Sequence, residues 1–332
     1  MRYIDNTLAT AFAEVREHAW ALPSISLDSE GSLVRKAGSL HWVSRLAGRR
    51  QDRYLGREDN PRSQQEAERL LAEREGRTAL LEKTRLLYRN GYPSVDAATA
   101  ATLAVLANLG FFRAGSVLVG TNAVQAVLSL LGAVGSRDKT EDIDLAQDLS
   151  LTLAGVGKLD FKALIRKLEE TGLHWHEVPN LPSHLPSVSL KAQKQALRID
   201  FLADGPNTGK PRALAVGFHA EPLPHMAYLL ADTQPGVVLG HNGPIPVMLP
   251  DPARLALHKI FSASHRPVFE TAKRAKDRRQ ATDLLDALLG LAMADRIRVA
   301  WEAFPAKGDI LDAAGDLQGQ LQEAGIQHLQ MR

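Results

Sequence analysis

A short apolar strand that ends in a glycine is the feature that most constrains the fold of this chain. Val117–Val119 is typical of a buried strand, it ends at Gly120-Thr121, and a helix is expected over Ala123–Leu131. A strand followed at once by a helix leaves free backbone N–H groups at the helix N-terminus, where they can bind phosphate. Glycine lets the backbone approach an anion because it has no Cβ. The pattern therefore predicts a phosphate-binding turn at Gly120 and Thr121, and a plain turn with a helix cap is the alternative.

Two carboxylates follow on the next expected strand, Glu141–Ala146. Alternate side chains of a strand share a face, so Asp142 and Asp144 project to one side, about 7 Å apart along the strand. Ile143 and Leu145 then point into a core. Two carboxylates on one face repel each other, which favours a cation between them. A solvent-exposed acidic edge is the alternative.

A third carboxylate, Asp200, lies in the apolar strand expected over Gln195–Leu202. Burying it is costly unless it is paired or bound to a metal. A salt bridge to Arg198 or another basic residue is the alternative. If the three aspartates act together, two Mg²⁺ ions would bridge them to the phosphates of a nucleoside triphosphate. Asp142 and Asp144 would hold both ions, and Asp200 would serve the metal beside the attacking hydroxyl and assist its deprotonation.

These segments together resemble the nucleotidyltransferase superfamily, which includes DNA polymerase β, the tRNA CCA-adding enzymes and toxin-type nucleotidyltransferases. The resemblance rests on three stretches: Phe111–Ala123, Leu131-Gly132 and Thr140–Ala146. The superfamily pattern is a hydrophobic residue with Gly-Ser, Gly-Gly or Gly-Thr, a helix, two carboxylates one residue apart and a later third carboxylate. Here Gly120 and Asp142 lie further apart than in the compact motif, and the extra residues fall in an expected loop.

The resemblance implies an enzyme that moves a nucleoside monophosphate from an NTP to an acceptor hydroxyl with two Mg²⁺ ions. It also implies a bacterial branch related to the toxins. The implied site consists of catalytic and metal-binding Asp142, Asp144 and Asp200 and of nucleotide-binding Gly120, Thr121 and Lys259. Lys259 would reach the triphosphate from a C-terminal helix, and an exposed helix lysine is the alternative. Asp277 and Asp283 are expected to be structural, capping or pairing with Arg or Lys.

The expected fold class is α+β, with a small mixed nucleotidyltransferase sheet flanked by helices. Three regions are expected: residues 1–95 with an N-terminal helix, a β-hairpin or meander and a long helix, residues 96–250 as the nucleotidyltransferase core, and residues 251–332 as a helical region. The expected helices include residues 5–20, 63–89, 97–109, 253–262 and 269–289, and Gly76 is a candidate interruption of the second. Short strands are expected at 32–34, 40–43, 54–55, 237–239 and 245–249.

Composition restricts the setting and the partners. The chain contains no cysteine, which excludes disulfides and thiolate metal sites. It shows no signal peptide pattern and no run of about 18 apolar residues, so we expect a cytoplasmic protein without a membrane span. Seven basic residues against one acidic lie between Arg35 and Arg57, and six against two lie between Phe261 and Gln280. These segments favour RNA, for example tRNA, as the acceptor.

Several alternatives stay open. The basic segments can be ordinary solvated surface, and the acceptor can be a protein hydroxyl or a small molecule. The chain can also be a regulatory module that binds nucleotide or RNA without turnover, or a toxin or defence factor whose antitoxin partner is not visible in the sequence. Walker-type glycine loops and the HExxH and GxSxG motifs are absent.

Overall fold

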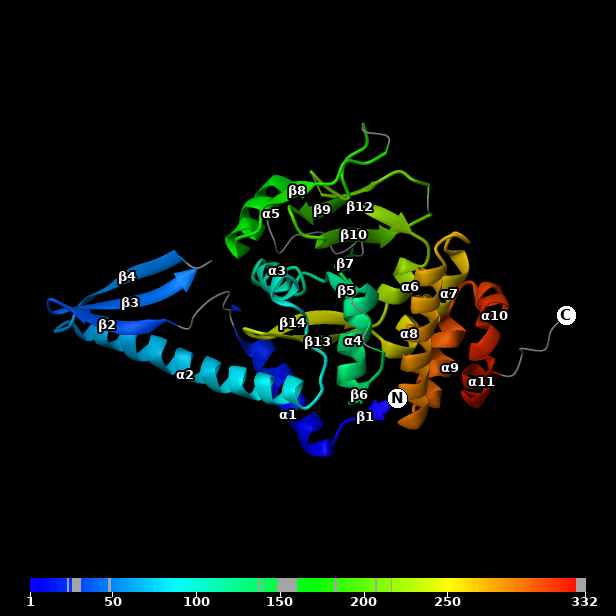
Figure 1. Cartoon of the computed structure of the whole chain (residues 1–332), viewed down its shortest axis with the longest axis horizontal. Coiled ribbons are helices and arrows are strands. Elements are labelled where there is room, and N and C mark those ends of the chain that lie inside the picture. Colours follow the sequence, from blue (N-terminus) through cyan, green and yellow to red (C-terminus); the bar gives the residue numbers. More distant parts are fainter. Residues whose placement is uncertain are drawn as a thin grey trace.

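Helices and strands are mixed along most of the chain. Figure 1 shows the computed structural model, which describes residues 1–22, 24–25, 31–46, 49–136, 138, 140–147, 160–181, 184–206, 208–215 and 217–326. Open mixed sheets are flanked by helices, so the predicted α+β class is confirmed. Among the described helices, none combines the length and the apolar character that crossing a membrane requires.

A mixed sheet forms the centre of the fold. Its main strands run in the order β11-β12-β10-β7-β5, and β9 and β8 continue it beside β10. Strand β7 is parallel to β10, and β10 is parallel to β12, whereas β5 is antiparallel to β7. The bounds of its strands are β5 Val117–Val119, β7 Asp142–Gln147, β8 Trp175–Glu177, β9 Ser189–Ala192, β10 Arg198–Asp204, β11 Arg212–Ala215 and β12 Phe218–Leu223.

One face of this sheet is apolar and closely packed. Ile143 of β7 and Ile199 of β10 are fully buried. Phe201 packs against Phe161 and Phe218, with ring centroids 5.3 and 4.7 Å apart. Because alternate side chains of a strand point to opposite faces, the residues between these positions point away from this core.

Helices and a long hairpin surround the sheet (Figure 1). The hairpin consists of β13 Thr233–Gly240 and β14 Gly243–Pro250, which include the two short strands predicted there. The remaining elements of this part are α3 Ala97–Asn108, α4 Gly120–Leu130, α5 Phe161–Leu168, η1 Glu169–Thr171 and α6 Met226–Leu230. Asp96 caps α3 as predicted, because its carboxylate accepts from the N–H groups of Ala98 and Thr99.

The C-terminal part of the described chain is helical, as predicted. Helices α7 and α8 pack against each other beside the strand ends of the central sheet (Figure 1). The bounds are α7 Pro252–His265, α8 Thr271–Gly290, α9 Ala294–Ala303, α10 Lys307–Ala314, η2 Gly315–Leu317 and α11 Gln318–Glu323.

The N-terminal part forms an arm that projects from the core (Figure 1). A three-stranded antiparallel meander, β2 Ser32–Lys36, β3 Ser39–Leu46 and β4 Arg49–Arg57, packs on the first half of α2 Pro61–Arg89. The second half of α2 packs on α1 Asn6–Ala21, and β1 Arg2–Tyr3 pairs with β6 Ala133–Val134. The candidate interruption at Gly76 is absent, because α2 runs through it unbroken. An isolated helix glycine costs only about 1 kcal/mol relative to alanine, and packing of both halves of α2 outweighs that cost.

Phe201→Ala tests whether the aromatic cluster holds the sheet to its covering layer. We expect a loss of about 3–5 kcal/mol in the free energy of unfolding, because the substitution leaves a cavity among buried rings. Urea unfolding measures it, with Val299→Ala, at a side chain that is 68% exposed, as the control that stays near the wild-type value. Equal midpoints for wild type and Phe201→Ala would contradict the packing described.

Candidate functional site

The three predicted aspartates meet on one face of the central sheet. Strands β7 and β10 are parallel neighbours, and their register sets Asp144 opposite Asp200. Asp142 lies two residues before Asp144 on the same strand, so it faces the same side. Asp142 is exposed, whereas the other two are partly buried. Since neighbouring strands lie about 4.8 Å apart, the two segments form one acidic surface.

Gly120 lies directly against this acidic surface. Val119, the last residue of β5, is opposite Asp144 in the antiparallel register of β5 and β7. Gly120 has φ +70°, and a Cβ built on it would lie 1.9 Å from Oδ2 of Asp144. Only glycine therefore fits at this close approach. Helix α4 begins at Gly120, three residues earlier than predicted, and Val119 supplies no side-chain cap to its first turn.

Asp200 has polar partners on its own sheet. Its Oδ1 accepts hydrogen bonds from Ser189 Oγ at 2.5 Å and from Arg198 Nε at 2.6 Å. Arg198 also donates to Ser189 Oγ at 2.8 Å. The salt bridge to Arg198, which the sequence left as an alternative, is thus present. This salt bridge is compatible with the position of Asp200 beside Asp144, because both hydrogen bonds to Asp200 use the same oxygen, Oδ1.

Asp144 is the electrostatically strained member of the group. Burial raises its pKa to about 7, and the negative charges of Asp200 and Asp142 add to the effect, while Lys259 and Lys276 oppose it. The two lysines therefore do not offset the burial and the neighbouring negative charges that disfavour ionisation of Asp144. A bound cation would add positive charge and favour the carboxylate form.

The aspartates line a pocket of about 570 Å³ between the sheet and the C-terminal helices. Strand residues and the Gly120-Thr121 turn form one wall, and α6, α7 and α8 contribute the other. The opposite wall is apolar at Met226, Leu229 and Leu255 and basic at Lys259, Arg266, Lys273 and Lys276. Acidic and basic walls that face each other across one pocket suit an anionic ligand that arrives with a cation.

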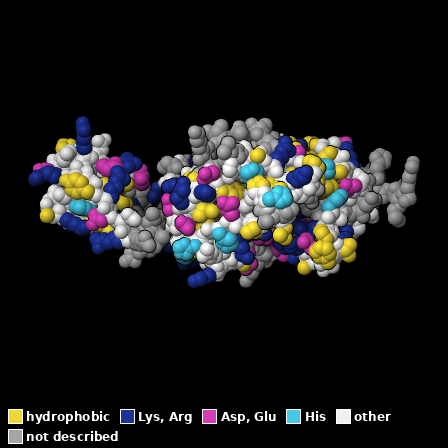
Figure 2. All heavy atoms as spheres, turned by 90° about the horizontal axis from the view of Figure 1, so that it is seen from above, with side chains coloured by type: hydrophobic (Ala, Val, Ile, Leu, Met, Phe, Trp, Pro, Cys, Tyr) yellow, Lys and Arg dark blue, Asp and Glu magenta, His cyan; other side chains and the backbone are white. Residues whose placement is uncertain are grey.

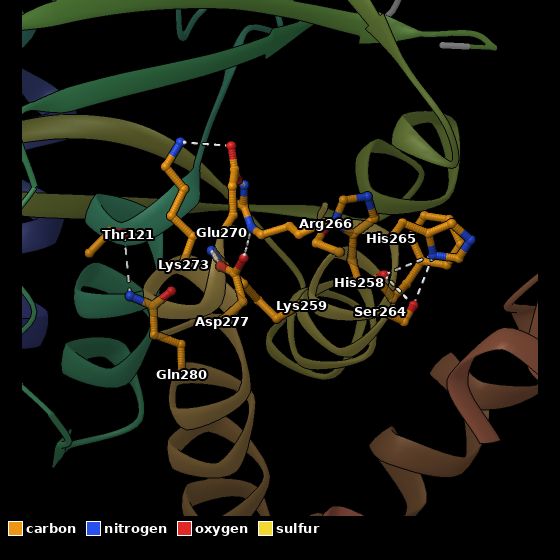
Figure 3. Close-up of polar contacts among 12 residues, drawn as sticks. Thr121, His258, Lys259, Ser264, His265, Arg266, Glu270, Lys273, Asp277 and Gln280 are labelled. Carbon is orange, nitrogen blue, oxygen red and sulfur yellow. Dashed lines mark hydrogen bonds and ion pairs between the residues drawn. The ribbon is translucent and has the colours of Figure 1, made fainter. Parts of the chain in front are cut away.

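Lys259 lies in a buried ion network at this wall (Figure 3). It is only 7% exposed, and its Nζ donates to Asp277 Oδ1 at 2.8 Å. Arg266 Nε donates to the other oxygen of Asp277 at 2.5 Å. Burial alone would raise the pKa of Asp277, but the two cations hold it below the ordinary value. The alternative of an exposed helix lysine is therefore wrong, and the structural role expected for Asp277 is confirmed.

Helix α8 also contacts the phosphate-binding turn that the sequence predicted. The buried Gln280 donates from Nε2 to Thr121 Oγ1 at 3.2 Å (Figure 3) and to Asp138 Oδ2 at 3.1 Å. Further along α8, Asp283 accepts from the backbone N–H of Ser136 at 2.7 Å. Asp283 is structural as expected, but its partner is a loop serine instead of a Lys or Arg.

Sequence reasoning missed several residues of the pocket. Lys273 and Lys276 belong to a segment recognised as basic, yet only the packing of α8 brings them opposite the aspartates. Glu221 of β12 lines the pocket because it lies opposite Leu202 of β10, two positions beyond Asp200. His258 is buried in the same wall, where burial and Lys259 lower its pKa to about 4. No local motif marks Glu221 or His258.

Stability of the cation-free protein is predicted to fall as pH rises toward 7. The pKa of Asp144 rises from 3.8 to about 7 on folding, so the folded state binds the extra proton between these values. Unfolding free energy then decreases with pH across this window, by an amount on the order of 2 kcal/mol. Urea unfolding in EDTA at pH 5 and pH 8 measures it, and Asp144→Asn removes this part of the pH dependence. The same pH dependence in wild type and Asp144→Asn would rule out the described environment.

Gly120→Ala is expected to destabilise the fold by about 1–3 kcal/mol, since it combines a left-handed φ with a collision at Asp144. The matched control is Gly308→Ala in α10, where a Cβ meets nothing within 4 Å. Urea unfolding compares the two variants. A Gly120→Ala protein as stable as Gly308→Ala would show that Gly120 does not approach Asp144 as described.

Comparison with known proteins agrees with this geometry. A family model described as Nucleotidyltransferase matches residues 97–304, which is more than half of the chain. The match extends from the start of α3 to the end of α9 and so spans the central sheet and the helices of the pocket. A search of curated proteins finds no match to the chain. The chain belongs to a family of nucleotidyltransferase enzymes.

Proposed function

We propose that this enzyme moves a nucleoside monophosphate from an NTP to an acceptor hydroxyl in the pocket described above. The observation that carries the proposal is the register of β7 and β10, which sets Asp144 beside Asp200, with Gly120 packed against Asp144. In this reaction the acceptor oxygen forms a bond to the α-phosphorus. The bond from that phosphorus to the bridging oxygen of the β-phosphate breaks, and pyrophosphate leaves.

The donor set of the pocket fits divalent cations. Asp142, Asp144 and Asp200 offer the hard oxygen ligands that Mg²⁺ prefers. Burial, and after it the charges of Asp200 and Asp142, raise the pKa of Asp144, and a bound cation would offset both effects. Among the residues that the structure describes, no three His, Asp or Glu side chains already form a group close enough to hold an ion. We therefore assign the aspartates jointly to two Mg²⁺ ions that arrive with the nucleotide. Bound there, the ions would neutralise phosphate charge and stabilise the attacking and leaving oxygens.

The chain's own groups would orient the nucleotide and move the proton. The first turn of α4, opened by Gly120 and Thr121, offers N–H groups to the phosphates. Lys259 lies across the pocket with Lys273 and Lys276, which supports a basic wall for the triphosphate. Both hydrogen bonds to Asp200 described above fall on Oδ1, so its Oδ2 stays available to accept the proton of the attacking hydroxyl.

RNA, for example tRNA, is our favoured acceptor, because basic segments lie on the arm and along α8. A toxin or defence role with an antitoxin partner is one biological use of the same chemistry, in line with the resemblance to toxin-type members of the polymerase β superfamily. Transfer to a protein hydroxyl is the second candidate. A regulatory module without turnover has no support from the family match, because that family consists of enzymes.

Asp144→Asn is expected to reduce transfer of label from α-³²P-NTP by more than about a hundredfold, because it removes charge that the reacting phosphate complex requires. The measurement incubates the enzyme and Mg²⁺ with each labelled NTP and with cellular RNA and protein together. Asp295→Asn is the matched control, since it makes the same change at a carboxylate that is 84% exposed on α9.

The fraction that becomes labelled identifies the acceptor. Label in RNA supports the favoured acceptor, and label only in protein selects the second candidate. Equal transfer by wild type and Asp144→Asn would remove Asp144 from the mechanism.

A further inference from the structure

The arm formed by β2–β4 and α2 carries an excess of positive charge. Residues 31–89 contain fourteen Lys and Arg against eight Asp and Glu, a formal charge of +6 in a chain whose total is +2. The rest of the chain, which includes the catalytic pocket, is therefore net negative. This asymmetry places the electrostatic attraction for a polyanion on the arm.

The meander of the arm has one covered face and one open face. Arg53 of β4 points to α2, since its guanidinium donates to Glu66 at 2.8 Å. Its neighbour Tyr54 therefore points to the opposite face, where it is 59% exposed. Tyr54 pairs in register with His41 of β3, and their rings lie 5.4 Å apart, edge to face. The open face thus presents two aromatic rings side by side.

Basic side chains surround these rings. Lys36 and His41 both contact Asp52, which places Lys36 on the open face as well. Arg50 lies two residues before Asp52 and has a side chain that is 64% exposed. Figure 2 looks onto the meander from above and shows hydrophobic and His side chains there among Lys and Arg, with some Asp and Glu. The ion pairs of these basic residues are exposed, and such pairs contribute little stability, so phosphates can compete for them.

We infer that this open face of the arm binds a single-stranded segment of an RNA acceptor, stacking a base on Tyr54 beside His41 and holding phosphates with Arg50 and Lys36. Exposed aromatic rings among basic residues are the usual means of holding unpaired nucleic acid. The meander packs on the first half of α2, and Figure 1 shows it at the opposite end of the molecule from α7 and α8, which line the pocket. Only an extended acceptor can reach both the arm and the pocket, which favours RNA over a small molecule. The inference rests on the proposed function for the identity of the acceptor.

The test measures binding of the full-length protein to a fluorescein-labelled 20-nucleotide oligouridylate by fluorescence anisotropy, without NTP. Tyr54→Ala is expected to weaken binding about tenfold through lost stacking. Arg50→Glu is expected to weaken it at least as much and to reduce the slope of log affinity against log salt by about one. Lys307→Glu on α10 makes the same charge change away from the arm, and Val299→Ala removes an exposed apolar side chain. Both controls should bind as wild type does.

The outcomes separate this inference from the proposed function. If both arm variants bind RNA weakly and the wild type transfers NMP to no acceptor, RNA binding by the arm is supported and the proposed transfer function is contradicted. If the wild type transfers NMP to RNA while Tyr54→Ala and Arg50→Glu bind RNA as tightly as the wild type, RNA binding by the arm is contradicted and the transfer function is supported. Absence of RNA binding together with label transfer to protein alone would also overturn the inference.

Discussion

The side-by-side placement of Asp144 and Asp200 is the constraint on which the pocket depends. Two carboxylates in register on neighbouring parallel strands repel each other, and burial together with the charge of Asp200 raises the pKa of Asp144. Nothing in the packing of the sheet requires acidic residues there, because the core lies on the other face with Ile143 and Phe201. An arrangement that costs stability and fills no core position is typical of a functional site.

The C-terminal helices α7 and α8 complete the pocket, and a network of polar contacts fixes their positions. Asp277 of α8 is fully buried and is stabilised by both Lys259 and Arg266. Removing one partner from such a network leaves a desolvated charge, which is more costly than the network is stabilising. Gln280 on the same helix contacts Thr121 at the start of α4. The position of α8 is therefore linked both to the basic wall and to the turn that begins beside the aspartates.

Charge is distributed unevenly between the arm and the rest of the chain. One wall of the pocket concentrates carboxylates on β7 and β10, and carboxylates repel a polyanion at close range. The basic residues of the arm lie away from these carboxylates, where they can attract a polyanion. Helix α2 keeps the meander away from the pocket, because the second half of α2 packs on α1 and the first half packs against the meander.

The sequence by itself determined the local features: the strands that carry Asp142, Asp144 and Asp200, the Gly120-Thr121 turn, the long helices and the α+β class. These follow from periodicity, glycine and caps, which act over a few residues. Only the tertiary structure decided that Asp200 lies opposite Asp144, that Lys259 is buried against Asp277, and that Glu221, His258, Lys273 and Lys276 share their pocket. Register between distant strands and the packing of α8 depend on the whole core, so no local pattern specifies them. The same limit explains Gly76, where packing at both ends of α2 outweighed a local tendency to break the helix.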